Sequence, residues 1–330
     1  MNHSNIHQEP LLHNGVEINP PEETGVFPVV LTSMLPHQRL SEWLAQSGEV
    51  VDQYLQSYGA MLFRGFEIAG SSGFNEILPA IFKEQIEYKQ RTSPRHAVLG
   101  NVYTSTDHPN DQVINMHTES SYGSPWPQRI CFFADVPAAS GGETPIADVR
   151  KMKSFLKEEV IRKFNRKGVL YMRNIMPGVG MSWKEIYQID NREELEKILT
   201  DNNYQVEWVS EDHLRLKWSR PAFRIHPDSG EQVWFNHAFF YSKHLLEEFI
   251  LEVIPPEDLP FVSYYGDGEE IEKEVIEEIR LAYEKSRIVF PWQKGDVLLL
   301  DNMLFAHGRM PFEGERRILV AMGNPVSQSV

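Results

Sequence analysis

The chain is short of cysteine. Its one cysteine, Cys131, rules out an internal disulfide, and without a second one neither a zinc knuckle nor a dithiol redox motif can form. Cys131 lies in the apolar run of residues 130–133. Free cysteine is among the most buried residue types, so this run predicts a buried strand rather than a reactive thiol.

Excess positive charge and long apolar runs are missing as well. Lys and Arg number 32 against 47 Asp and Glu, and the net charge of -15 disfavours binding to nucleic acid or an anionic membrane. No uncharged apolar run is long enough to span a bilayer, and the polar residues 1–13 lack the apolar core of a signal peptide. We therefore expect a soluble, cytoplasmic protein without nucleic-acid or membrane partners.

The composition that remains is that of a globular protein. The 330 residues are 41% hydrophobic and contain no repeat or linker, which predicts a single domain over residues 1–330 with its core at about 25–325. Strand patterns occur early, at residues 60–64 and 129–136, and late, at 296–301 and 317–322. Helical spacing dominates residues 150–203, which we interpret as a helical insertion.

Strands that are distant in sequence must then pair with one another. This order predicts a mixed α/β fold with a mainly β core, in which an antiparallel jelly-roll barrel, or double-stranded β-helix, is braced by helices.

The segment His117-Thr118-Glu119 carries the clearest chemical signal. On an extended segment, residues two apart point to the same side, so the imidazole and the carboxylate can bind one metal ion. Such a pair is common by chance and needs a third ligand. His307 follows the predicted strand 296–301, which would end near the mouth of the barrel. Two histidines and one carboxylate form the facial triad of non-haem iron oxygenases.

Several motifs in the same order along the chain resemble the taurine dioxygenase (TauD/TfdA) family of Fe(II)- and 2-oxoglutarate-dependent oxygenases. They are residues 59–65 (GAMLFRG), His117-Thr118-Glu119, residues 141–144 (GGET), and Asp301-Asn302 through His307 to Arg316-Arg317. The sequence looks most like the SyrP-like branch of amino-acid hydroxylases, in which the carboxylate ligand is often Glu. The resemblance implies a clavaminate synthase-like jelly roll that uses Fe(II), the cosubstrate 2-oxoglutarate and O2.

The resemblance also implies roles for the residues around the metal. Arg317 corresponds to the arginine that binds the far carboxylate of 2-oxoglutarate, for which a planar, bidentate guanidinium is suited. Thr144 corresponds to the threonine whose hydroxyl assists the same carboxylate. Arg316 is the other candidate, but only one of two adjacent strand residues can face the site, and we assign Arg317 to it.

The reaction implied is hydroxylation of an unactivated C–H bond, while 2-oxoglutarate is decarboxylated to succinate and CO2. Glu119 fills the position that a small residue leaves open in related halogenases, so oxygen transfer is expected rather than halogenation. Desaturation and epoxidation by the same oxidative chemistry remain open. Taurine-specific members have an arginine where this chain has Ala321, which argues against a sulfonate substrate. The expected substrate is an amino acid, free or tethered to a carrier protein, in secondary-metabolite (antibiotic or peptide) biosynthesis.

Three residues are candidates for substrate binding. Arg309, close to His307, and Arg129, close to the first motif, could bind an anionic group, and Asn236 lies in the polar-aromatic cluster of residues 234–237. Two other classes of protein stay possible at this point. A cupin-like metal hydrolase would use the ligands to hold zinc, although its chemistry has no need of Arg317. A non-catalytic barrel would be expected to have lost part of the ligand set, which is complete here.

Overall fold

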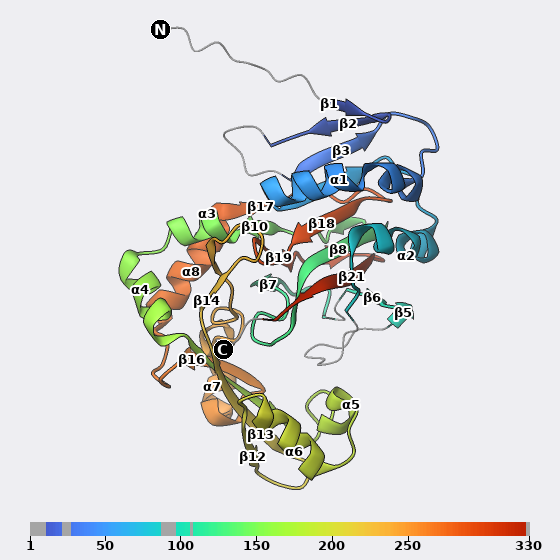
Figure 1. The fold of residues 1–330 in the computed structure, drawn as a ribbon. Coiled ribbons are helices and arrows are strands. Elements are labelled where there is room, and N and C mark those ends of the chain that lie inside the picture. Colours follow the sequence, from blue (N-terminus) through green and yellow to red (C-terminus); the bar gives the residue numbers. More distant parts are fainter. Residues whose placement is uncertain (1–10, 22–27, 87–96, 106–107, 328–330) are drawn as a thin grey trace, which may run out of the picture.

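A nine-stranded sheet forms the main layer of the computed structural model (Figure 1). The structure describes residues 11–21, 28–86, 97–105 and 108–327. The strands follow the order β1 (Leu11–His13), β2 (Val16–Asn19), β3 (Val29–Ser33), β4 (Ala60–Arg64), β18 (Val297–Asp301), β8 (Trp126–Val136), β21 (Arg317–Val326), β6 (Val102–Thr104) and β5 (Ala97–Leu99). Strands from both ends of the chain thus lie side by side, as the strand pattern predicts.

The two faces of this sheet have different partners. On β8, Cys131 and Phe133 belong to a core that also contains residues of α1 (Leu40–Tyr58) and α2 (Gly70–Ile81). Phe132 and Ala134 of the same strand belong to a separate core on the other face. This alternation follows from the two-residue period of a strand, and it confirms Cys131 as a buried strand residue.

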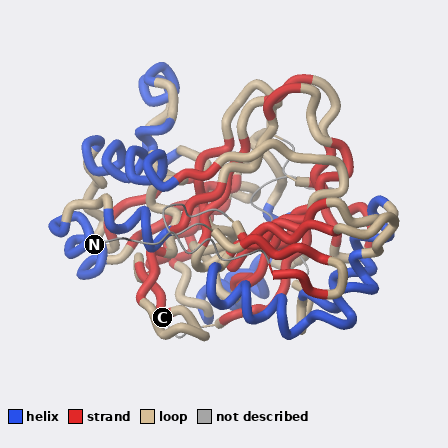
Figure 2. Tube along the Cα trace, turned by 90° about the horizontal axis from the view of Figure 1, so that it is seen from above, coloured by secondary structure: helices blue, strands red, loops and turns tan. Residues whose placement is uncertain are grey.

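A second, four-stranded sheet packs against the inner face. Its strands follow the order β17 (Arg287–Ile288), β10 (Ile146–Asp148), β19 (Phe305–Arg309) and β7 (Ile114–His117). The ring of Phe132 in the large sheet lies 5.1 Å from the ring of His307 in the small one, so the two sheets close on each other. The result is the expected double-stranded β-helix core, and Figure 2 shows strands gathered in the middle with helices toward the outside.

The middle of the chain forms a further layer. Its helices are α3 (Val149–Ser154), α4 (Glu158–Lys167), α5 (Trp183–Tyr187), α6 (Arg192–Asp201), α7 (Glu248–Val253) and α8 (Lys273–Ser286), with short 3-10 turns η1 (Lys243–Leu245) and η2 (Pro256–Asp258). Its sheet has the order β12 (Gln205–Trp208), β13 (Leu214–Arg220), β11 (Val169–Ile175) and β16 (Phe261–Tyr265).

The interpretation of residues 150–203 as a helical insertion is therefore wrong in part. β11 lies inside this segment, and it pairs with β13 and β16, which come much later in the chain. Such non-local pairing leaves only a short apolar run in the sequence, which is not distinguishable from a piece of buried helix.

Two short strand pairs complete the fold. They are β14 (Phe223–Ile225) with β15 (Gln232–Trp234), and β9 (Ser140–Gly141) with β20 (Phe312–Glu313). Within the described part of the chain, no helix is long and apolar enough to cross a membrane.

Candidate metal centre

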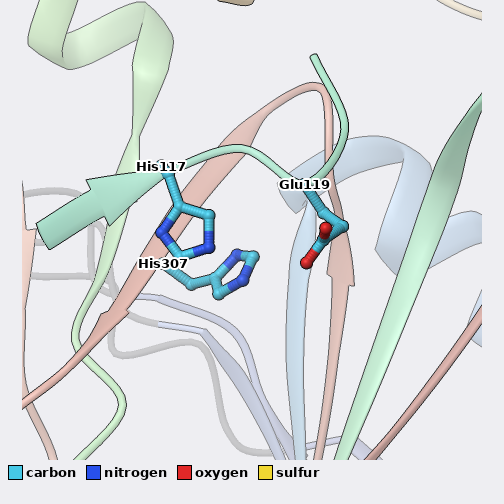
Figure 3. Close-up of side chains that lie close together, drawn as sticks. All are labelled: His117, Glu119 and His307. Atoms are coloured by element: carbon cyan, nitrogen blue, oxygen red, sulfur yellow. The ribbon is translucent and has the colours of Figure 1, made fainter. Parts of the chain in front are cut away.

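The three predicted ligands come together between the sheets. His117 ends β7, Glu119 follows two residues later, and His307 lies opposite His117 in β19, where the two residues are paired across the strands. One ligand atom from each residue lies within 4.8 Å of the other two. Figure 3 shows the two imidazole rings and the carboxylate facing a common space. This donor set fits a facial triad, which leaves coordination positions for cosubstrate and oxygen.

Hydrogen bonding orients the first of these ligands. Nδ1 of His117 lies 2.8 Å from the carbonyl oxygen of Asn115, to which it can only donate. The tautomer with the proton on Nδ1 leaves Nε2 as the metal-binding atom, as is usual for histidine ligands. The ring of Phe240 packs on the ring of His117, with 4.6 Å between their centroids, and restricts its rotation.

A small cavity adjoins the two histidines. It is lined by Ser105, Ile114, His117, Phe132, Thr144, His307, Gly308, Arg309, Arg316, Ile318 and Val320. Its polar end is formed by Arg316, whose Nη1 donates to Ser105 Oγ at 3.2 Å and whose Nη2 lies 3.5 Å from Thr144 Oγ1. The indole of Trp292 donates to the same hydroxyl at 3.1 Å. A guanidinium and a hydroxyl thus converge on one end of a cavity whose other end is the metal site.

The placement of Arg317 in this cavity, expected from the sequence, is wrong. Arg317 forms an ion pair with Asp135 at 2.6 Å on the other side of the sheet, and its side chain is 52% exposed. Arg316, Ile318 and Val320 line the cavity, whereas Leu319 and Ala321 join the outer core. Neighbouring strand residues do face opposite ways, as expected. The residue that faces the cavity is Arg316, however, and not Arg317.

Arg316 is held in a constrained environment. Its Nε donates to the carbonyl oxygen of Gly142 at 2.8 Å. Burial, with a smaller effect of nearby Arg309, lowers the pKa of Arg316 to about 10. The guanidinium therefore stays protonated at neutral pH and retains the charge needed to bind a carboxylate.

A larger cavity of about 500 Å³ adjoins His117 and Glu119. It is lined by His108, Gln112, Val113, Ile114, Asn115, His117, Glu119, Tyr122, His237, Phe240, Tyr241, Ser242, Leu245, Leu246, Pro260 and Phe261. The set is rich in aromatic rings and, among the described residues, contains neither Lys nor Arg. A cavity of this size next to an open metal position is suited to a small organic substrate.

The structure places the three predicted substrate residues outside this larger cavity. Arg129 donates to the Ile81 carbonyl and forms an ion pair with Asp52 at 2.6 Å. The buried amide of Asn236 is occupied with the backbone of Ala222 and Ala238. These two residues hold the fold together rather than face a ligand.

Arg309, the third, lines the smaller cavity instead. Its guanidinium donates to the carbonyls of His108, Pro109 and Gln112, and so holds the loop that borders the substrate side.

Two residues outside the predicted set line the larger cavity, namely His237 and Phe240. His237 follows Asn236, and its Nδ1 lies 2.6 Å from Ser121 Oγ, which leaves its Nε2 side toward the cavity wall. Phe240 covers His117. The polar-aromatic cluster 234–237 was the available signal, but it does not show which member faces inward.

Comparisons with known proteins agree with this geometry. A model of the "Taurine catabolism dioxygenase TauD, TfdA family" matches residues 33–322. The protein belongs to the TauD/TfdA family. The dapdiamide synthesis protein DdaC of Enterobacter agglomerans is 40% identical over 283 residues, covering 84% of this chain and 86% of DdaC. A clavaminate synthase-like protein of Arabidopsis thaliana is 26% identical, covering 91% of this chain and 94% of its own.

Solved structures support the fold. PvcB of Pseudomonas aeruginosa superimposes with a TM-score of 0.58 at 14% identity and covers 96% of this chain and 94% of PvcB. AAD-2, solved in complex with Mn(II) and N-oxalylglycine, gives a TM-score of 0.55 at 13% identity and covers 96% of this chain and 99% of AAD-2. As a TauD-family member, the protein is an oxidoreductase, a dioxygenase that depends on Fe(II), 2-oxoglutarate and O2.

Proposed function

We propose that this TauD-family oxygenase hydroxylates an unactivated C–H bond of an aminoacyl substrate, presented by a carrier protein or as the free amino acid. His117, Glu119 and His307 hold the iron, and Arg316 with Thr144 binds the far carboxylate of 2-oxoglutarate. The observation that carries the proposal is that two cavities meet at the ligand set: one is lined by His117, His307 and Arg316, and the other by His117, Glu119 and aromatic rings.

The cosubstrate side follows from charge and geometry. The far carboxylate of 2-oxoglutarate needs a cation and a hydrogen-bond donor, and Arg316 and the Thr144 hydroxyl supply them at the end of the smaller cavity. A 2-oxoglutarate bound in this way would direct its keto-acid end toward His117 and His307, which line the same cavity. With iron bound, the centre supplies the oxidising power for the reaction, in which substrate, O2 and 2-oxoglutarate give hydroxylated product, succinate and CO2.

The substrate side is aromatic rather than charged. Phe240, Tyr241 and Phe261 offer apolar surface to a side chain, while His237 and Ser242 offer single polar contacts. A free amino acid would bring a carboxylate for which the described lining residues provide no Lys or Arg. A thioester on a carrier protein has no such charge, so the lining favours the carrier-tethered form.

The relationship to DdaC supports a role in antibiotic or peptide natural-product synthesis. DdaC carries the description "dapdiamide synthesis protein", and its identity to this chain extends over most of both proteins. Ala321, taken from the sequence as evidence against a sulfonate, lies in the outer core and lines neither cavity, so it gives no information about the substrate.

Succinate release tests the proposal. The purified protein, supplied with Fe(II), 2-oxoglutarate and O2, is assayed against free amino acids and against the same aminoacyl groups as pantetheine thioesters. We expect stimulation by one or more thioesters and a product that gains one oxygen atom. A product that loses two hydrogens would show desaturation, and an oxygen inserted into an alkene would show epoxidation. Absence of stimulation by both sets would refute the aminoacyl substrate.

A further inference from the structure

Asn302 lies in the turn between β18 and β19 and is fully buried, with 0% of its surface exposed. Its Oδ1 accepts a hydrogen bond from the backbone N–H of Glu119 at 2.7 Å. Its Nδ2 donates to the carbonyl oxygen of the same residue at 2.9 Å and to that of Pro127 at 2.8 Å. One amide side chain therefore binds both backbone groups of a metal ligand.

Glu119 lies in a turn rather than in a strand. β7 ends at His117, so Glu119 lies beyond the sheet on the connecting loop seen in Figure 3. The next residue, Ser120, has a left-handed φ of 57°, which turns the chain away from the strand direction. A ligand on such a loop depends on side chains from elsewhere to fix its backbone. Asn302 does so from a segment that is distant in sequence.

The turn that carries Asn302 is itself anchored. Oδ1 of Asp301 accepts from the backbone N–H groups of Met303 at 2.9 Å and Leu304 at 3.3 Å. Its Oδ2 lies 2.9 Å from Nε2 of His226, and both residues are buried. The backbone N–H of Asn302 donates to the Gln128 carbonyl at 2.7 Å. These hydrogen bonds fix the turn, and the turn holds the side chain of Asn302 beside Glu119.

We propose that Asn302 is a positioning residue for the metal centre, which sets the affinity for iron by holding the backbone of Glu119. The inference rests on the proposed function in taking His117, Glu119 and His307 as the ligands. An amide alone combines an acceptor with two donors in this arrangement. Loss of partners that orient a metal ligand typically weakens metal affinity about 10- to 100-fold.

Metal titration tests the role without a substrate. Metal-stripped wild type and the variants Asn302→Asp and Asn302→Ser are titrated with Mn(II), and bound metal is measured by electron paramagnetic resonance. Asn302→Asp keeps an oxygen that can accept from the Glu119 N–H. It replaces the Nδ2 donor by a carboxylate oxygen, which cannot donate to the carbonyl oxygens of Glu119 and Pro127. Asn302→Ser removes the hydrogen bonds of the amide without burying a charge. It is the variant to titrate if Asn302→Asp does not fold. We expect Kd for Mn(II) to rise about 10- to 100-fold in both.

Asn236→Asp is the matched control. Asn236 is another buried asparagine, and its amide makes two backbone contacts, to the Ala222 carbonyl at 2.8 Å and from the Ala238 N–H at 2.9 Å. We expect this variant to lose thermal stability but to keep the wild-type Kd for Mn(II). Wild-type affinity in a folded Asn302 variant, or equal weakening in Asn236→Asp, would overturn the inference. Failure of the wild type to bind Mn(II) would instead refute the ligand set and the proposed function.

Discussion

Arg316 and Arg317 are neighbours in the chain and point to opposite sides of the large sheet. Arg316 lines the cavity beside His307 and contacts Thr144, whereas Arg317 forms an ion pair with Asp135 on the outer side. Two adjacent arginines thus have different roles, one in the cavity and one on the outer surface. This arrangement makes the two arginines a natural pair of variant and control.

Replacing Arg316 should weaken the binding of 2-oxoglutarate, whereas replacing Arg317 should not. A charge-assisted hydrogen bond contributes about 1.5–3 kcal/mol, so Arg316→Gln should weaken 2-oxoglutarate binding roughly 10- to 150-fold. Arg317→Gln loses only a partly exposed ion pair, which contributes at most about 1 kcal/mol to stability. Binding is measured by titrating 2-oxoglutarate into the anaerobic Fe(II) protein. Equal Kd values for wild type and Arg316→Gln would contradict the assignment.

Truncation of Phe240 should change the substrate side. Phe240→Ala removes the ring that covers His117 and enlarges the aromatic cavity. We expect a higher KM for the native substrate and more succinate formed per product, because substrate and metal are no longer held in register. Phe249→Ala is the control, since Phe249 is 64% exposed on α7 and does not line the cavity. Unchanged coupling in Phe240→Ala would show that this wall does not position the substrate.

The hydrogen bond between His226 and Asp301 predicts a pH-dependent stability. Burial alone would lower the pKa of His226, but the hydrogen bond to Asp301 and its charge outweigh burial and raise the pKa. A raised pKa in the folded state means that protonated His226 stabilises the protein below its unfolded pKa of about 6.5. This contribution is lost as the pH rises through the folded-state value.

The comparison of wild type with His226→Gln isolates this effect. The difference in the free energy of unfolding, measured by urea denaturation from pH 5.5 to 9, should be largest at the acidic end and shrink toward alkaline pH. A difference that grows with pH would show that His226 is neutral in the folded protein throughout the range.

The sequence predicts most of the metal centre and only part of what surrounds it. The chemistry of His117, Glu119 and His307 is visible in residue types and spacing, and these residues do meet in the structure. The inward-facing arginine was not predictable, because Ile318 and Leu319 are both apolar and give no indication of which face is the barrel interior. Asn236 and His237 are likewise both polar, so the sequence does not indicate which of them faces the cavity.

Contacts between distant segments were beyond the reach of sequence patterns. The hydrogen bonds from Asn302 to Glu119 join residues far apart in the chain. The strand β11 depends on partners that come much later. In both cases the tertiary fold determines which segment is the partner. Local periodicity shows only which face of an element a residue lies on, and not what that face contacts.

Visible absorption of the anaerobic protein tests the central claim most directly. Metal-stripped protein is mixed with Fe(II) and then with 2-oxoglutarate, and the spectrum is compared with that of His117→Ala and Arg316→Gln. We expect a visible band in the wild type that needs both additions. The band should be absent in His117→Ala and should require more 2-oxoglutarate in Arg316→Gln. A wild type without the band, or a band that survives in His117→Ala, would contradict the proposed centre.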